Sequence, residues 1–155
     1  MAVPKRVKRE VEFNLHNVNY LLGVIKTSIH DIVCSGYGYG YTRERVQTNN
    51  IRDSTADKAI LLIDGTPEMQ KARKWLKVIN ENRLYFEGTP EGEFMAQYFG
   101  KAKTQVEVGE ELGASFPWTA RCKVKIVAHC AMLAASEGLF TITDFRREEY
   151  DDDSL

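Results

Sequence analysis

The sequence lacks any apolar segment long enough to cross a membrane. Among its 155 residues there is no run of about 18 consecutive apolar residues, the length that a membrane-spanning helix needs. The basic start, residues 1–9, is not followed by the apolar stretch of a secretory signal peptide. Its three cysteines, Cys34, Cys122 and Cys130, form no Cys-x-x-Cys pair. We therefore expect a cytoplasmic protein with reduced thiols and without a metal site.

Side chains suited to catalysis are also scarce. The histidines are His16, His30 and His129, and none lies in a His-Glu-x-x-His motif. No serine or cysteine lies in the context of a nucleophile elbow. The consecutive aspartates at positions 151–153 are typical of a solvated charge run. The sequence thus predicts a protein that is not an enzyme and uses no cofactor.

An excess of charge of either sign is missing, because 21 Lys and Arg face 22 Asp and Glu, for a net charge of −1. The charges are nevertheless placed unevenly. Residues 101–125 carry five basic residues against three acidic ones, and acidic residues prevail from Asp144 onward. Residues 1–9 contain no acid and carry Lys5, Arg6, Lys8 and Arg9. The balance therefore leaves nucleic-acid binding open, although a module with so small a basic excess needs a second copy to bind firmly.

Signals for helix ends recur along the chain. Gly65-Thr66-Pro67-Glu68 and its repeat at residues 88–91 place a Gly after one helix and an N-cap Thr with Pro before the next. Residues 54–57 have the spacing of a capping box. These signals predict an all-α fold with a long N-terminal helix, connecting helices and a C-terminal helix-turn-helix. The expected divisions are an N-terminal helix (1–34), a Gly- and Tyr-rich linker (35–53), a helical domain (54–143) and an acidic tail (144–155).

The clearest periodicity lies in residues 10–33. Apolar residues recur there in alternating steps of four and three, which is the pattern of a coiled-coil seam on one helix. The members of this heptad stripe are Val11, Leu15, Val18, Leu22, Ile25, Ile29 and Ile32. The stripe favours self-association, with a dimer as the simplest form. The alternative is an amphipathic helix packed inside its own domain.

Residues 104–137 have the pattern of two helices joined by a short turn. Thr104 and Glu107 have capping-box spacing. Gly113 ends the first helix, and Ser115 is an N-cap for a second, longer helix. Gly109 lacks a side chain where the two helices would approach closely. This pattern is typical of a helix-turn-helix, whose second helix enters the major groove of DNA, and the alternative is a helical hairpin that only packs.

On this interpretation the helix-turn-helix makes the domain 54–143 a DNA-binding domain. Arg121 is the residue suited to bidentate recognition of guanine. Thr104 and Gln105 lie at a helix N-terminus, where a phosphate is favoured. The predicted contacts are Phe116, Pro117, Ala120 and Arg121 at base edges, and Thr104, Gln105, Lys101, Lys103, Lys123 and Lys125 at phosphates. The residues expected to face the interior are Thr119, Cys122 and Ile126.

The stretch from Thr104 to Ser115, Thr-xxx-Val-Gly-xx-Leu-Gly-Ala-Ser, resembles the helix-turn-helix of sigma-factor region 4. The layout of residues 11–139 is similar to that of phage late-gene transcriptional regulators of the RinA/ArpU type, with residues 53–60 at the place of their Thr-x-x-x-Ala stretch. This resemblance implies sequence-specific binding of double-stranded DNA at a phage promoter, contact with host RNA polymerase and a location in the host cytoplasm. It also implies that Thr104 positions a phosphate and that Arg121, with residues 116, 117 and 120, reads bases.

Two other functions are compatible with these residues. Regulators of this type usually carry polar or basic residues where this chain has Phe116, Pro117 and Trp118. Exposed aromatic residues there would suit a protein-binding module, such as an inhibitor of host machinery. A small-terminase-like DNA-packaging protein also joins a helix-turn-helix to an oligomerising helix, and it would form a closed ring.

Overall fold

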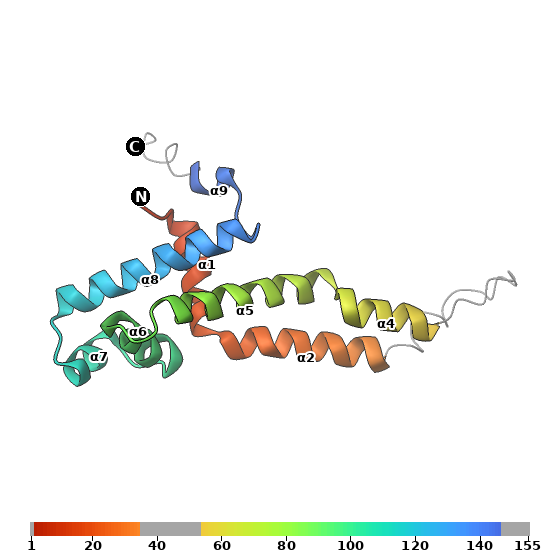
Figure 1. The fold of residues 1–155 in the computed structure, drawn as a ribbon, viewed down its shortest axis with the longest axis horizontal. Helices are drawn as coiled ribbons and strands as arrows, with labels where there is room; N and C mark the ends of the chain where they lie inside the picture. Colours follow the sequence, from red (N-terminus) through yellow and green to blue (C-terminus); the bar gives the residue numbers. More distant parts are fainter. Residues whose placement is uncertain (1, 35–53, 147–155) are drawn as a thin grey trace, which may run out of the picture. The chain divides into compact units, whose positions relative to one another are not determined.

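The computed structural model describes residues 2–34 and 54–146, and the regular elements in these ranges are all helical (Figure 1). They are α1 (Lys5–His16), α2 (Val18–Cys34), α4 (Ser54–Asp64), α5 (Pro67–Tyr85), α6 (Pro90–Met95), the π-helix η2 (Ala96–Gly100), α7 (Gln105–Leu112), α8 (Phe116–Ser136) and α9 (Ile142–Arg146). The predicted all-α fold is confirmed. The predicted linker and the end of the predicted acidic tail, beyond residue 146, lie outside the described residues. Within the described ranges, no helix combines the length and the apolar character needed to span a membrane.

The predicted long N-terminal helix is divided in the structure. Helix α1 ends at His16 and α2 begins at Val18, with Asn17 between them at φ −120° and ψ 44°. The Asn17 side chain donates a 2.7 Å hydrogen bond to the Phe13 carbonyl. Asparagine side chains compete in this way with backbone hydrogen bonds and weaken a helix. The prediction of one continuous helix is therefore wrong, because the spacing of apolar residues carries no information about a break of one residue.

The chain divides into two compact units, one of residues 1–18 with 74–155 and one of residues 19–73. This grouping differs from the division expected from the sequence. Helix α1 belongs to the same unit as α7 and α8, and the boundary between the units falls inside α5. Helix α9 continues regular structure to Arg146, two residues past the expected start of the acidic tail.

The unit of residues 19–73 contains α2, α4 and the beginning of α5. On α2, Leu21 and Ile32 are buried, whereas Leu22 and Ile29 are exposed. The exposed large apolar residues of α4 are Ile60, Leu61 and Ile63. This unit therefore leaves several large apolar side chains of α2 and α4 exposed to solvent.

The two Gly-Thr-Pro-Glu segments end and begin helices as predicted. Gly65 and Gly88 have φ values of 81° and 75°, in the left-handed region that favours glycine. The hydroxyls of Thr66 and Thr89 each accept a hydrogen bond from the amide three residues further on, at 3.3 and 3.2 Å. These caps fix where α5 and α6 begin.

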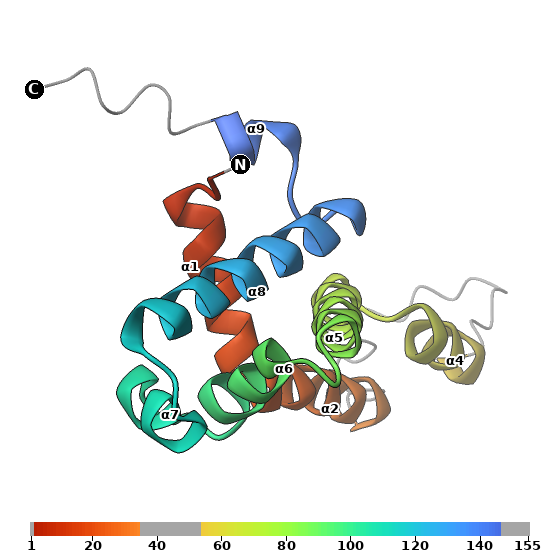
Figure 2. The same cartoon turned by 60° about the vertical axis from the view of Figure 1, so that its left-hand side comes forward.

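The other unit is built around α8. Helices α1, α6 and α7 each pack on α8, and α1 crosses it in both Figure 1 and Figure 2. Helix α1 contributes Val7, Val11 and Leu15 to the core of this unit, and these side chains are at most 3% exposed. The other large buried residues of this unit include Trp75, Val78, Phe94, Phe99, Val108, Ile126 and Val127. Val11 and Leu15 thus belong to the core of the chain itself, and Ile32 of α2 is buried within the chain as well, so the predicted role of these three residues in self-association is wrong.

Candidate nucleic-acid interface

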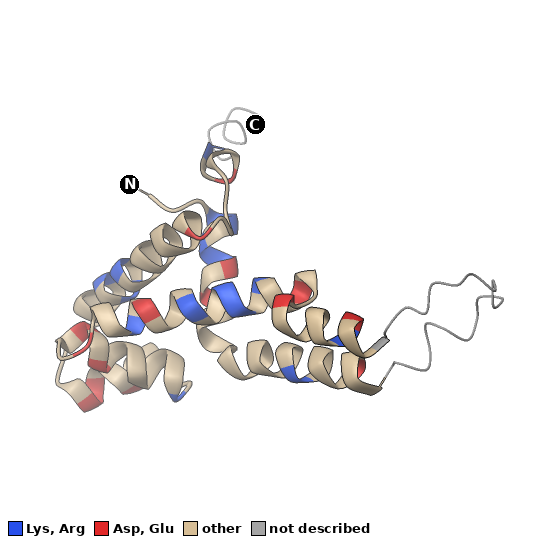
Figure 3. Ribbon diagram, turned by 45° about the vertical axis from the view of Figure 1, so that its right-hand side comes forward, with Lys and Arg blue, Asp and Glu red and all other residues tan. Residues whose placement is uncertain are grey.

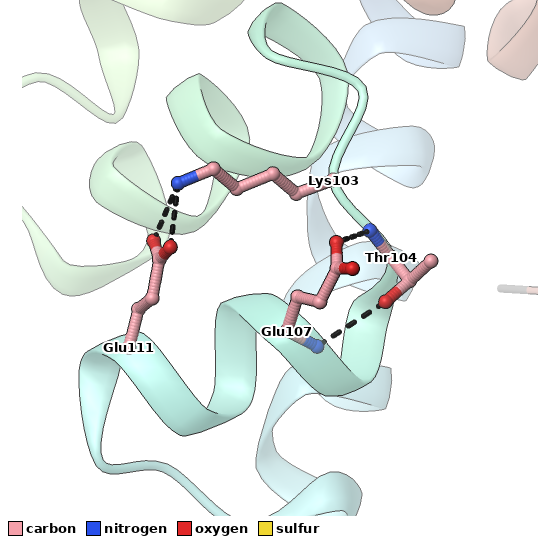
Figure 4. Close-up of polar contacts among 4 residues, drawn as sticks. All are labelled: Lys103, Thr104, Glu107 and Glu111. Atoms are coloured by element: carbon pink, nitrogen blue, oxygen red, sulfur yellow. Dashed lines mark hydrogen bonds and ion pairs between the residues drawn. The ribbon is translucent and has the colours of Figure 1, made fainter.

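Helix α7 begins with the predicted capping box. The Thr104 hydroxyl accepts a hydrogen bond from the Glu107 amide at 3.2 Å, and the Glu107 carboxylate accepts one from the Thr104 amide at 3.0 Å (Figure 4). This reciprocal pair gives partners to amides that a helix start otherwise leaves unsatisfied. The capping box is therefore confirmed, and it fixes the direction in which α7 leaves residue 104.

A three-residue turn, residues 113–115, joins α7 to α8. Gly113 adopts φ 62° and ψ 31°, and the Ala114 amide donates a 2.8 Å hydrogen bond to the Gly109 carbonyl. A Cβ atom on Gly109 would lie 3.1 Å from the Ala114 carbonyl oxygen, so glycine permits this close approach. Ser115 occupies the N-cap position of α8, but within the described residues its side chain makes no capping hydrogen bond.

The outward side of α8 begins with exposed residues of mainly apolar character. Phe116 and Val124 are each 61% exposed, and Pro117 and Arg121 are exposed as well. At 100° per residue, positions 117, 121 and 124 fall on one narrow stripe. Ala120, which was predicted to contact bases, is half-buried. We call Pro117, Arg121 and Val124, together with the exposed Phe116 at the start of the helix, roughly 100° around its axis from Pro117, the outer stripe of α8. Val124 was missed from the sequence, although its spacing of three residues from Arg121 was an available signal.

The inner side of α8 is packed, as the sequence predicts. Thr119, Cys122 and Ile126 are at most 2% exposed. The Thr119 hydroxyl donates a 2.8 Å hydrogen bond to the Phe116 carbonyl and accepts a 3.0 Å hydrogen bond from the Gln105 side chain. Gln105, a predicted phosphate contact, is thus held against Thr119 and joins α7 to α8.

Three of the predicted phosphate-binding lysines make ion pairs within the chain, and the side chains of two of them, Lys103 and Lys123, are partly buried. Lys103 Nζ lies 2.6 and 2.8 Å from the two carboxylate oxygens of Glu111 (Figure 4). Lys123 Nζ lies 3.4 Å from a carboxylate oxygen of Glu12 and 5.5 Å from the centre of the Tyr98 ring. Because the Lys123 side chain is only 25% exposed, we remove it from the candidate interface and assign it to the contact between α1 and α8.

Lys123 belongs to a cluster of polar and aromatic side chains between α1, η2 and α8. The His16 ring centre lies 5.1 Å from that of Tyr98 and 4.7 Å from that of Phe99. Burial and the charge of Lys123 lower the pKa of His16, against a smaller opposing effect of Glu12. Burial acts to lower the pKa of Lys123, but Tyr98 and Glu12 together raise it above its ordinary value. The Lys123 charge is therefore satisfied inside the protein.

His129 makes a polar contact between α5 and α8. Its Nδ1 atom lies 2.7 Å from Asn82 Oδ1, and its ring stacks on that of Tyr85 with 4.0 Å between the ring centres. Burial lowers the pKa of His129. The Asn82 amide group also donates a 3.5 Å hydrogen bond to the Ile126 carbonyl. We infer a structural role for this pair. Among the described residues, no group of three or more His, Cys, Asp or Glu could hold a metal ion.

The remaining predicted cations are accessible. Lys101 is exposed, and the Lys125 side chain is 65% exposed with its Nζ 3.6 Å from a carboxylate oxygen of Glu91. Acidic residues at positions 107, 110 and 111 make α7 negative, whereas basic residues lie on α8 and on the first half of α1 (Figure 3). The candidate interface is therefore the outer stripe of α8, with Lys125 one turn beyond Arg121 and Lys101 preceding α7. No protein-family model, curated protein or solved structure gives a significant match to this chain.

Proposed function

We propose that the chain is a sequence-specific DNA-binding protein that inserts the first turns of α8 into the major groove. The observation that carries this proposal is the position of Arg121, which is exposed on the outer stripe of a helix whose inner side is packed. An α-helix fits the width of the major groove. Because the packed inner side holds the helix in place, the backbone of Arg121 is presented in one position, which favours a defined contact with a base.

The chemistry of the outer stripe suggests the kind of sequence it recognises. The Arg121 guanidinium can donate two parallel hydrogen bonds to O6 and N7 of guanine. Phe116 and Val124 offer apolar surface, and the methyl group of thymine is the apolar group that the major groove displays. We therefore expect a target that contains guanine beside thymine. Lys101 and Lys125 would neutralise flanking phosphates.

For the biological role, we propose transcriptional regulation in the cytoplasm, at a late promoter of a phage and with contact to host RNA polymerase. The support is the likeness of residues 104–115 to sigma-factor region 4. The capping box at Thr104 and the left-handed Gly113, both present in the structure, are consistent with that likeness.

We further propose that the chain binds DNA as a homodimer or a larger homo-oligomer. Leu22 and Ile29, two members of the heptad stripe, are 41% and 38% exposed, and Val33 is 53% exposed. Positions 22, 29 and 33 fall on one side of α2 at 100° per residue. A second copy packed on this side would bury apolar surface that one chain leaves in water. Two linked DNA-binding units then offset the weak affinity of each.

A specific observation also favours a second function, which is protein binding. Phe116, Val124 and Met132 are between 61% and 70% exposed along α8. Aromatic residues and methionine are enriched in the centres of protein interfaces. In this alternative, α8 anchors a partner protein, and the chain has no measurable affinity for duplex DNA at about 100 mM salt.

Selection of bound duplexes from a random pool, at two salt concentrations, tests the proposed function. We expect an enriched sequence that Arg121→Ala binds more weakly by about 1–3 kcal/mol, whereas Met132→Ala, about 16 Å further along the helix, binds it normally. Replacing thymine by uracil in that duplex removes only methyl groups, and we expect the wild type to bind the uracil duplex more weakly. The Phe116→Ala variant should bind the thymine and uracil duplexes equally. Absence of an enriched sequence would contradict DNA recognition and favour protein binding.

The mass of the chain in solution tests the assembly. We expect a dimer or a small oligomer, which Leu22→Asp with Ile29→Asp converts to a monomer while the helical content is kept. A closed ring of about eight or more subunits would instead favour DNA packaging. A monomeric wild-type chain would contradict the proposed self-association.

A further inference from the structure

The first two turns of α1 concentrate positive charge on the solvent side of that helix. The first turn contains no acidic residue. The four cations of the two turns are all exposed. Val7, Val11 and Leu15 are buried and mark the side of α1 that packs on the core. The exposed cations form a group that we call the basic face of α1, consisting of Lys5, Arg6, Lys8 and Arg9.

Part of the charge pattern on the basic face opposes the stability of the helix that carries it, although Arg6 with Glu10 and Lys8 with Glu12 have opposite charges at the i,i+4 spacing. Cations near the N-terminal end of a helix interact unfavourably with its dipole. Lys5 and Arg9 form a like-charge pair at the i,i+4 spacing, and Arg6 and Arg9 form another at i,i+3. Arg6 lies 3.4 Å from Asp144 of α9, but its side chain stays 64% exposed. Residues that weaken a fold locally and share one exposed face are expected at functional surfaces.

The chemistry of this face favours a row of phosphate groups as its partner. A membrane-binding basic helix needs an apolar side to enter the lipid, whereas the apolar side of α1 is buried in the core. Duplex DNA presents closely spaced phosphates, and cations that neutralise them release counterions. Helix α1 packs directly on α8, so a duplex bound by α8 lies against the same unit.

We propose that the basic face of α1 contacts the phosphate backbone of the duplex whose major groove α8 enters. This inference rests on the proposed function and adds a second surface to it. The outer stripe of α8 reads bases, and the basic face of α1 supplies binding that is independent of sequence. A chain with a net charge of −1 can bind a polyanion in this way, because four of its cations are gathered on the basic face of α1.

The test uses the full chain and compares three proteins: wild type, Lys8→Ala with Arg9→Ala, and a control with Lys26→Ala and Lys74→Ala. The control removes two exposed cations from α2 and α5. Dissociation constants are measured for the enriched duplex and for a random duplex over a range of NaCl concentrations. In the Lys8/Arg9 variant we expect weaker binding to both duplexes and a salt slope smaller by about 2, with an unchanged or higher melting temperature. The control keeps the wild-type slope.

Four results would overturn the inference. An unchanged slope in the Lys8/Arg9 variant, with an enriched sequence still selected by the wild type, leaves the proposed function intact and shows that α1 does not touch DNA. A lower melting temperature in this variant shows that the two cations serve the fold. Equally tight binding of the wild type to poly-glutamate, lost in the variant, identifies a site for acidic proteins. No binding of the wild type to any duplex removes both this inference and the proposed function.

Discussion

Replacement of Gly92 by alanine is expected to destabilise the unit that contains α8. A Cβ atom at this position in α6 would lie 2.1 Å from the Phe86 carbonyl oxygen and 3.0 Å from its carbonyl carbon. That oxygen also accepts hydrogen bonds from the Thr89 hydroxyl at 2.6 Å and the Thr89 amide at 3.1 Å. The backbone would have to move by about 1 Å and would strain both bonds, and overpacking of this kind costs about 1–3 kcal/mol.

Part of that destabilisation is offset, because alanine stabilises a helix by about 1 kcal/mol relative to glycine. The severity of the contact places the net loss for Gly92→Ala near 2 kcal/mol, which lowers the melting temperature by roughly 10 °C. Both tryptophans, Trp75 and Trp118, lie in this unit, so their fluorescence during urea denaturation reports its unfolding. The control is Gly100→Ala, where a Cβ would meet no atom within 4 Å. Equal midpoints for the Gly92 and Gly100 variants would refute the reasoning.

Three further predictions concern a cap, a histidine and the thiols. Thr104→Ala removes the capping box of α7 and should lower the free energy of unfolding by about 1 kcal/mol, whereas Ser115→Ala should change it little. Urea denaturation compares the two variants, and equal losses would contradict the assigned caps. Burial holds the pKa of His129 below 6.5, so the unfolded chain binds more protons near that pH, and stability should rise between about pH 5.5 and 7.5. Urea midpoints at the two pH values measure this effect, and a midpoint that falls with pH would contradict it. Burial raises the pKa of Cys130 to about 12 while Cys34 is exposed, so a thiol reagent should label Cys34 first, and early labelling of Cys130 in peptide mass spectra would contradict its burial.

Helix boundaries could be predicted where the deciding groups lie within four residues of one another. The Thr104 cap, the turn at Gly113 and the glycines at positions 65 and 88 all depend on local hydrogen bonds and backbone angles. These requirements are written in short stretches of sequence, so the start of α7 and the end of its turn match the prediction. The buried side of α8 was also predictable, because helical spacing from Thr119 defines it.

The partners of the helices could not be predicted in the same way. Val11 and Leu15 have the spacing of a coiled-coil seam, but a core helix of a single chain shows the same spacing. Only the packing of α1 on α8 shows which partner buries them. The break at Asn17 depends on a competition between side-chain and backbone hydrogen bonds that composition does not resolve.

The candidate interface was predicted in outline and corrected in detail. Arg121 is exposed, as its position in the helical stripe requires, and its contact with a base stays a prediction. Lys123 is also a cation and lies two residues further along α8, yet it is held by Glu12, which belongs to a helix far away in the sequence. Whether a cation is available to a ligand thus depends on tertiary neighbours, which a reading of nearby residues does not provide.

The unit built around α8 joins the beginning of the chain to its second half, and residues 19–73 are inserted between them. During synthesis α1 therefore leaves the ribosome long before α8, and Val7 stays without its core until roughly 110 further residues have been added. We expect this order to make the unit a slow folder for a helical protein, because its defining contacts are distant in sequence.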